Sequence, residues 1–131
     1  MPVENNALRG APLVLLRVEG ASVFAASSYA FALTGLPWSF YAAPFFAPDL
    51  GMLGYLGGPR IGAVTYNALH FYALPLLLGV LGLLAGQPLF QAIAAIWAAH
   101  IGFDRMFGYG LKYASAFTDT HLDRIGVRAR T

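Results

Sequence analysis

Apolar residues fill four long runs of the chain, and short groups of glycine and proline separate these runs. Asp49 is the only charged residue between positions 20 and 59, and positions 61–103 contain none. A helix needs about 20 consecutive apolar residues to cross the hydrocarbon core of a bilayer. The pattern therefore predicts four membrane-spanning helices, over residues 12–33, 37–56, 60–85 and 88–108.

The apolar runs are continuous and rich in alanine, leucine and glycine, which favours helices over a membrane β-barrel. Pro44 and Pro48 fall inside the second run and predict a kink or break there. Glycines at four-residue spacing, such as Gly54, Gly58 and Gly62, would let helices approach closely. The predicted fold is all-α: one domain over residues 1–131, a polytopic bundle of four transmembrane helices with a kinked second helix.

Composition agrees with a lipid environment. The chain has 131 residues, of which 58% are hydrophobic and 11% charged, and its mean hydropathy is +0.61. A soluble domain contains about 25% charged residues. The absence of cysteine excludes disulfides and thiolate ligands, and a net charge of +2 without a basic run argues against a nucleic-acid partner. The expected partners are the lipid bilayer and either further copies of the chain or a larger membrane complex.

Positive charges predict the orientation of the four spans. The loops after the first and third spans contain no charge, whereas Arg9, Arg60 and the basic residues of the tail over 109–131 fall on one side of the bundle. The positive-inside rule places that side in the cytoplasm. The first ten residues are polar, so the first span is expected to be retained. We therefore expect a multi-pass protein of the inner (plasma) membrane with both termini cytoplasmic.

Each predicted span carries polar side chains at a similar depth. A rise of about 1.5 Å per residue puts them roughly 6–15 Å from the cytoplasmic ends of their helices. A charge inside hydrocarbon costs about 2.5–3.5 kcal/mol on insertion scales, so these side chains are expected to face one another in the bundle interior. The residues of this polar layer are Glu19, Asp49, Asn67, His70, His100 and Asp104.

Three interpretations of the polar layer are open. In the first it is a structural network, in which Glu19 pairs with Arg17 or Arg60 and Asp104 pairs with a histidine. Arg17, Arg60 and Arg105 can also extend to the membrane interface.

In the second interpretation the layer binds a divalent metal. Two histidines with carboxylates match the donors of Zn, Mn or non-haem Fe, and His100 and Asp104 share a helix face at i and i+4. His70, His100 and Asp104 are the predicted ligands. The third interpretation is haem, with His70 and His100 as axial ligands.

A metal in this layer predicts hydrolysis of a lipid or lipid-linked substrate. Asp49 or Glu19 would complete the ligand set or act as general base. His121 in the tail is either part of a solvated end or an additional ligand on a lid over the site. The alternative is a non-enzymatic accessory subunit or a small membrane protein that handles protons or cations. No Walker A loop, GxSxG elbow or HExxH motif is present, which argues against nucleotide chemistry and serine hydrolysis.

The stretches "LLRVEG", "APDLGMLGYLGGPRIGAVTYNALHFYALPLLLG" and "AAHIGFDRMFGYGLKYASAFTDTHLDRIG" resemble the domain-of-unknown-function 4260 family, over about residues 13–126. The resemblance implies a small helical bacterial membrane protein and brings no activity with it. The segment "HIGFD" also resembles the His-x3-Asp helix of inner-membrane metal-dependent hydrolases, through His100 and Asp104 alone. The early His-Arg and Thr-His-Ser motifs of that group are missing from this chain.

Overall fold

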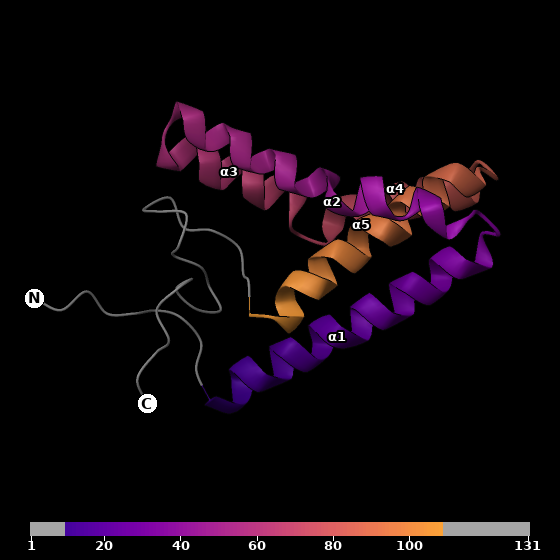
Figure 1. The fold of residues 1–131 in the computed structure, drawn as a ribbon, viewed down its shortest axis with the longest axis horizontal. Coiled ribbons are helices and arrows are strands. Elements are labelled where there is room, and N and C mark those ends of the chain that lie inside the picture. Colours follow the sequence, from indigo (N-terminus) through magenta and orange to yellow (C-terminus); the bar gives the residue numbers. More distant parts are fainter. Residues whose placement is uncertain (1–9, 109–131) are drawn as a thin grey trace, which may run out of the picture.

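The computed structural model describes residues 10–108, and this part of the chain contains helices and no strand (Figure 1). The predicted all-α fold is confirmed. In chain order the elements are α1 (Gly10–Leu33), the 3-10 helix η1 (Trp38–Phe40), α2 (Ala42–Phe46), the 3-10 helix η2 (Ala47–Gly57), α3 (Pro59–Leu69), α4 (Ala73–Leu84) and α5 (Pro88–Met106).

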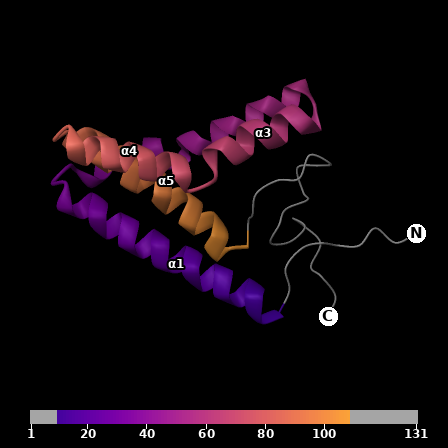
Figure 2. The same cartoon turned by 180° about the vertical axis from the view of Figure 1, so that it is seen from behind.

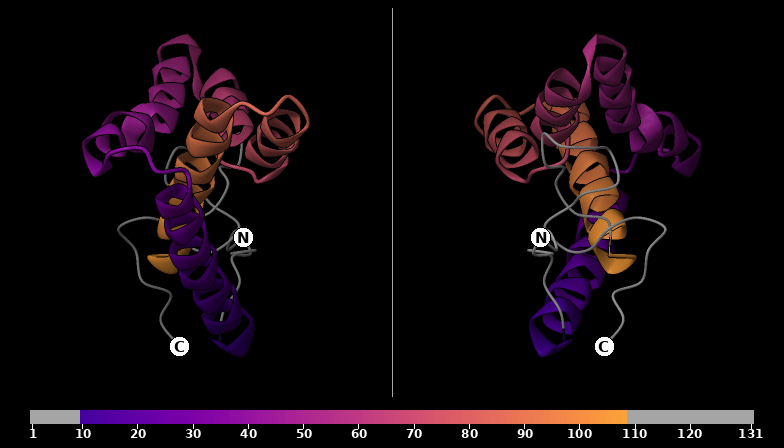
Figure 3. Two further views of the ribbon diagram at one scale, coloured as in Figure 1. Left: turned by 90° about the vertical axis from the view of Figure 1, so that its right-hand side faces the viewer. Right: turned by 90° about the vertical axis from the view of Figure 1, so that its left-hand side faces the viewer.

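Helix α5 lies at the centre of the fold, where it packs against α1, α2 and α4 (Figures 1 and 3). It runs antiparallel to α1. At one end of this pair Arg17 Nε donates to the carbonyl of Met106 at 2.8 Å, and at the other end Phe31 packs with Ala92 and Ile96. The start of α1 and the end of α5 therefore lie at the same end of the molecule, as Figure 2 shows from behind.

Two glycines let the backbones of α1 and α5 touch. A Cβ atom added to Gly20 would lie 2.7 Å from the carbonyl oxygen of Gly102, and one added to Gly102 would lie 2.7 Å from the carbonyl oxygen of Gly20. Both distances are shorter than carbon–oxygen contact allows. The crossing thus requires glycine on both helices, as in the close helix pairs of membrane proteins.

The second predicted span, over 37–56, is broken into η1, α2 and η2. Pro44 and Pro48 explain the break, because proline lacks the amide hydrogen and its ring clashes with the carbonyl four residues before it. The predicted kink is confirmed and is larger than a simple bend. Of the three pieces, η2 is an 11-residue 3-10 helix, which is long for this helix type.

Helix η2 folds back antiparallel on α3. Thr65 Oγ1 donates to the carbonyl of Gly51 at 2.7 Å. Gly54 lies against Thr65, and Gly62 lies against the ring of Tyr55, where a Cβ on either glycine would collide. The close approach predicted from glycine spacing is therefore found between η2 and α3.

The predicted span over 60–85 is found as Pro59–Leu84, and residues 70–72 interrupt its helix between α3 and α4. His70 leaves helical geometry, with φ −121° and ψ 19°. Pro75 explains the position of the break, since it cannot donate to the carbonyl of residue 71 and its ring would clash with it. The break places His70 between two helical segments that continue in similar directions (Figure 1).

Two segments of the described chain, Gly10–Leu33 and Pro59–Leu84, are long and apolar enough to cross a membrane. The second of these includes the break at 70–72. Large apolar side chains on both are exposed, among them Leu15, Leu33, Leu76 and Leu84. The segment over 37–56 and helix α5 do not reach the same length and hydropathy.

Candidate metal centre

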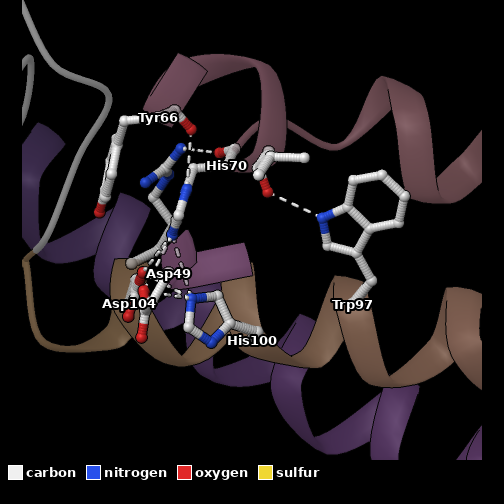
Figure 4. A network of polar contacts seen from close by, with 8 residues as sticks. Asp49, Tyr66, His70, Trp97, His100 and Asp104 are labelled. Atoms are coloured by element: carbon white, nitrogen blue, oxygen red, sulfur yellow. Dashed lines mark hydrogen bonds and ion pairs between the residues drawn. The ribbon is translucent and has the colours of Figure 1, made fainter. Parts of the chain in front are cut away.

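Four side chains from three parts of the fold meet in one place. Asp49 comes from the first turn of η2, His70 from the break after α3, and His100 and Asp104 from adjacent turns of α5 (Figure 4). One donor atom from each residue lies within 4.8 Å of all the others. We call these four residues the Asp–His cluster.

The cluster distances fall in a narrow range. His100 Nε2 lies 3.2 Å from Asp49 Oδ1 and 3.3 Å from Asp104 Oδ2. His70 Nε2 lies 3.4 Å and 3.5 Å from the same two oxygens. The two Nε2 atoms are 3.1 Å apart. All four groups thus point toward one common centre.

Burial differs among the four residues. His70 is 0% exposed and His100 2%, whereas the side chain of Asp104 is 13% and that of Asp49 38% exposed. The ring of Phe45 covers His100 in an edge-to-face contact, with centroids 5.2 Å apart. The cluster is therefore closed around its histidines and open to the outside at Asp49.

The orientation of His70 is fixed by two contacts with its own helix. Its Nδ1 lies 2.8 Å from the carbonyl oxygen of Tyr66, which can only accept, so Nδ1 carries the proton and donates. In the neutral ring Nε2 then has a free lone pair, which points into the cluster. The Tyr66 ring stacks on the imidazole, with the ring centroids 3.7 Å apart and an angle of 6° between the ring planes. Metal-binding histidines commonly have such a backbone partner on the second nitrogen.

Five of the six donor-atom distances suit a metal as well as hydrogen bonds, and the two carboxylate oxygens lie within 4.8 Å of each other. Charge-assisted N–H···O bonds measure about 2.7–2.9 Å, shorter than the nitrogen–oxygen distances of this cluster. Ligand atoms around a tetrahedral zinc, with bonds of about 2.0–2.1 Å, lie roughly 3.3 Å apart. The five distances above range from 3.1 to 3.5 Å. Four acceptor groups whose ligand atoms all lie within 4.8 Å of one another could hold one ion.

The same geometry does not fit haem. Axial nitrogens lie on opposite sides of the iron, so bonds near 2 Å put them about 4 Å apart with the macrocycle between them. The Nε2 atoms of His70 and His100 are 3.1 Å apart and share two carboxylates. The two histidines therefore face one small ion site and leave no room for a porphyrin.

A family model described as a domain of unknown function (DUF4260) matches residues 13–125. The chain belongs to the DUF4260 family. The matched region contains every residue of the Asp–His cluster. No curated protein and no solved structure matches the chain.

In this DUF4260 protein two side chains of α5 bind the backbone at the helix break. Trp97 Nε1 donates to the carbonyl of Leu69 at 2.7 Å, and Arg105 Nη2 donates to the carbonyl of His70 at 2.7 Å. The carbonyls at the end of a helix lack intrahelical partners, so these donors satisfy them. The possibility that Arg105 extends to a membrane interface is not realised: the residue is 7% exposed and points into the fold.

Glu19 is not part of the cluster. It is exposed on α1 and lines a separate cavity of about 550 Å³, together with Tyr72 and Arg105. Among residues 10–108, the cluster is the only group of three or more histidines and acids close enough to share an ion. The prediction that one layer would include Glu19 is therefore wrong in this respect.

Asn67 and Arg60 both lie in α3. Asn67 is half-buried in α3, where its carbonyl accepts the amide of His70 at 3.1 Å. Arg60 is exposed in the first turn of α3. His121 lies outside the described residues. The hydrogen bond from Arg105 to the His70 carbonyl could not be predicted from the sequence. An arginine that follows an aspartate is equally consistent with a salt bridge.

Proposed function

We propose that this DUF4260 protein is an integral membrane protein that binds one divalent transition metal at the Asp–His cluster and hydrolyses a lipid or lipid-linked substrate there. The observation that carries the proposal is the convergence of four donor atoms within 4.8 Å, two of them on almost fully buried histidines. Asp49, His70, His100 and Asp104 are the proposed ligands.

Charge supports a divalent ion in this position. Two ionised carboxylates in a largely apolar fold carry two negative charges that need compensation. Both histidine Nε2 atoms face these carboxylates, and their separation of 3.1 Å disfavours a proton on each of them. One divalent cation would neutralise both carboxylates and accept both nitrogen lone pairs. The cluster then needs no additional buried charge.

The donor set narrows the choice of metal. Calcium and magnesium prefer oxygen ligands alone, whereas imidazole with carboxylate suits Zn, Mn and Fe. When bound, such an ion acts as a Lewis acid on a carbonyl or phosphoryl oxygen. Asp49 is the most exposed of the four side chains. It is therefore the residue that substrate and water would reach, and the one that could accept a proton.

The proposed location is the inner (plasma) membrane. Two segments are long and apolar enough to cross it, and their large apolar side chains are exposed, as lipid contact requires. The antiparallel pairing of α1 and α5 agrees with both termini on one side, which the positive-inside rule makes cytoplasmic. A site open at Asp49 within such a fold suits an amphiphilic substrate.

Metal analysis of the purified protein in mild detergent tests the site. The wild type is expected to contain about one equivalent of Zn, Mn or Fe, and His100→Ala less than about a tenth of one. Glu19→Gln is the matched control, because it removes a carboxylate outside the cluster and should leave the metal content unchanged. His121→Ala tests the predicted tail ligand. Metal-free wild-type protein, after growth and purification without chelator, would contradict the proposal.

The exposure of Asp49 also favours a second candidate, a non-enzymatic protein that exchanges protons or cations, alone or as a subunit of a larger complex. Reconstituted vesicles distinguish the two. Cation or proton flux that is lost in Asp49→Asn would favour exchange. Hydrolysis of a lipid substrate that is lost in the same variant, without flux, would favour the enzyme.

A further inference from the structure

The backbone at His70 depends on α5 for its position. His70 lies between α3 and α4, where regular helical hydrogen bonding is interrupted over residues 70–72. Its carbonyl accepts from Arg105 Nη2 at 2.7 Å, and both residues are buried, with exposures of 0% and 7%. On the same helix Trp97 holds the carbonyl of Leu69 at 2.7 Å. Two side chains of α5 thus fix the peptide units on either side of the His70 Cα atom.

We propose that Arg105 is a positioning residue that holds His70 in the geometry needed to bind the metal. This inference rests on the proposed metal site. The imidazole has its own anchor at the carbonyl of Tyr66, but that contact fixes only the rotation of the ring relative to α3. The bond from Arg105 fixes the His70 backbone relative to α5, which supplies His100 and Asp104.

One turn of α5 both supplies a residue of the Asp–His cluster and holds the backbone of His70 on the other side of it. Asp104 and Arg105 are consecutive in α5: the first presents its carboxylate to the cluster and the second binds the backbone of the opposing histidine. Helix α1 restricts the place of Arg105, because a Cβ on Gly20 would collide with the Cβ of Arg105. The glycine crossing of α1 and α5 therefore also creates the space in which Arg105 is held.

An electrostatic role and a positioning role of Arg105 predict opposite changes in metal affinity when this residue is replaced. A guanidinium close to a cation site repels the cation, so a purely electrostatic role predicts tighter metal binding when the positive charge is removed. A positioning role predicts weaker binding, since His70 would lose its fixed relation to His100 and Asp104. Loss of a group that orients a metal ligand typically lowers metal affinity about 10–100-fold. The direction of the change decides between the two roles.

The experiment measures Zn²⁺ affinity by chelator competition, and the visible absorption of bound Co²⁺, on the full chain in detergent. Arg105→Met is expected to bind Zn²⁺ about 10–100-fold more weakly and to change the Co²⁺ spectrum at saturation. Arg105→Lys, which keeps a donor, is expected to recover part of the affinity. Arg17→Met is the matched control: it also removes an arginine bond to a carbonyl of α5, at Met106, and should stay within about threefold of wild type.

The outcomes separate this inference from the metal site itself. A wild type that binds no metal would overturn the site and the role of Arg105 together. A wild type that binds Zn²⁺, with equal or tighter binding by Arg105→Met and an unchanged Co²⁺ spectrum, would overturn the positioning role alone. Thermal melting of the metal-free variants establishes that they fold. If Arg105→Met does not fold, Arg105→Leu takes its place, because it also lacks a hydrogen-bond donor and has the same expected loss.

Discussion

The Nε2 atoms of His70 and His100 lie 3.1 Å apart, although the two residues belong to different helical segments and are 30 positions apart in the chain. Each nitrogen also lies within 3.5 Å of two carboxylate oxygens. A shared positive charge between these groups, either a metal ion or a proton on a histidine, would stabilise their close approach. The stability of the fold should therefore depend on what occupies this centre.

Zinc should stabilise the folded protein. A ligand that binds only the folded state, at a concentration 100 times its Kd, contributes about 2.7 kcal/mol. We expect a higher Tm of the detergent-solubilised wild type on addition of Zn²⁺ and a lower Tm with a chelator. His100→Ala should abolish the shift, while Glu19→Gln should retain it. The same Tm with and without metal in the wild type would contradict this prediction.

The two carboxylates should contribute unequally to metal affinity. The side chain of Asp104 is 13% exposed and that of Asp49 38%. Electrostatic attraction is stronger where water is excluded, so Asp104→Asn should weaken Zn²⁺ binding about tenfold more than Asp49→Asn, or roughly 1.4 kcal/mol. Isothermal titration of both variants, with Glu19→Gln as control, measures the difference. Equal losses would show that exposure does not set the contribution.

Alanine should be tolerated at one glycine and not at another. Gly20→Ala would place a Cβ 2.7 Å from the carbonyl oxygen of Gly102, and we expect it to destabilise the fold by about 1–3 kcal/mol. Gly79→Ala is the matched control within a helix, because its Cβ would meet only Ala94 Cβ at 3.5 Å. Thermal or denaturant unfolding in detergent compares them. An unchanged free energy of unfolding in Gly20→Ala would show that α1 and α5 can move apart without loss of stability.

The proposed topology can be tested with single cysteines, because the chain has none of its own. Ala7→Cys, before α1, should lie in the cytoplasm. Ser39→Cys, in the exposed η1 after α1, should lie outside. In intact cells a membrane-impermeant maleimide is expected to label position 39 and not position 7. Labelling of both positions, or of neither until lysis, would contradict a single crossing by α1.

Spacing and depth along the chain predicted that four polar residues would lie close together, and the structure brings these four into one cluster. His100 and Asp104 share a face at i and i+4, and Asp49 and His70 were placed at a similar depth. All four meet in the structure. Depth says nothing about rotation around the helix axis, which explains the failure at Glu19. Its neighbour Gly20 faces α5, and one residue along a helix turns the side chain by about 100°.

The break at residues 70–72 could have been predicted from Pro75, whose ring is incompatible with the carbonyl of residue 71. The continuous apolar run concealed it. The contacts of Trp97 and Arg105 with the freed carbonyls could not have been predicted, since they depend on how α5 lies against α3 and α4. Local sequence signals report where a helix ends. They do not report which distant side chain binds the end.

The origin of the four donors has a consequence for biosynthesis. Asp49 and His70 belong to the hairpin made by η2 and α3, whereas His100 and Asp104 are on α5, the last helix of the described chain. While α5 is still inside the ribosome, the nascent chain presents only two of the four proposed metal ligands, Asp49 and His70. Two ligands are too few to retain a metal ion for which other cellular molecules compete. Metal uptake would then follow synthesis of α5, so that a product terminated before α5 stays metal-free and open to membrane proteases.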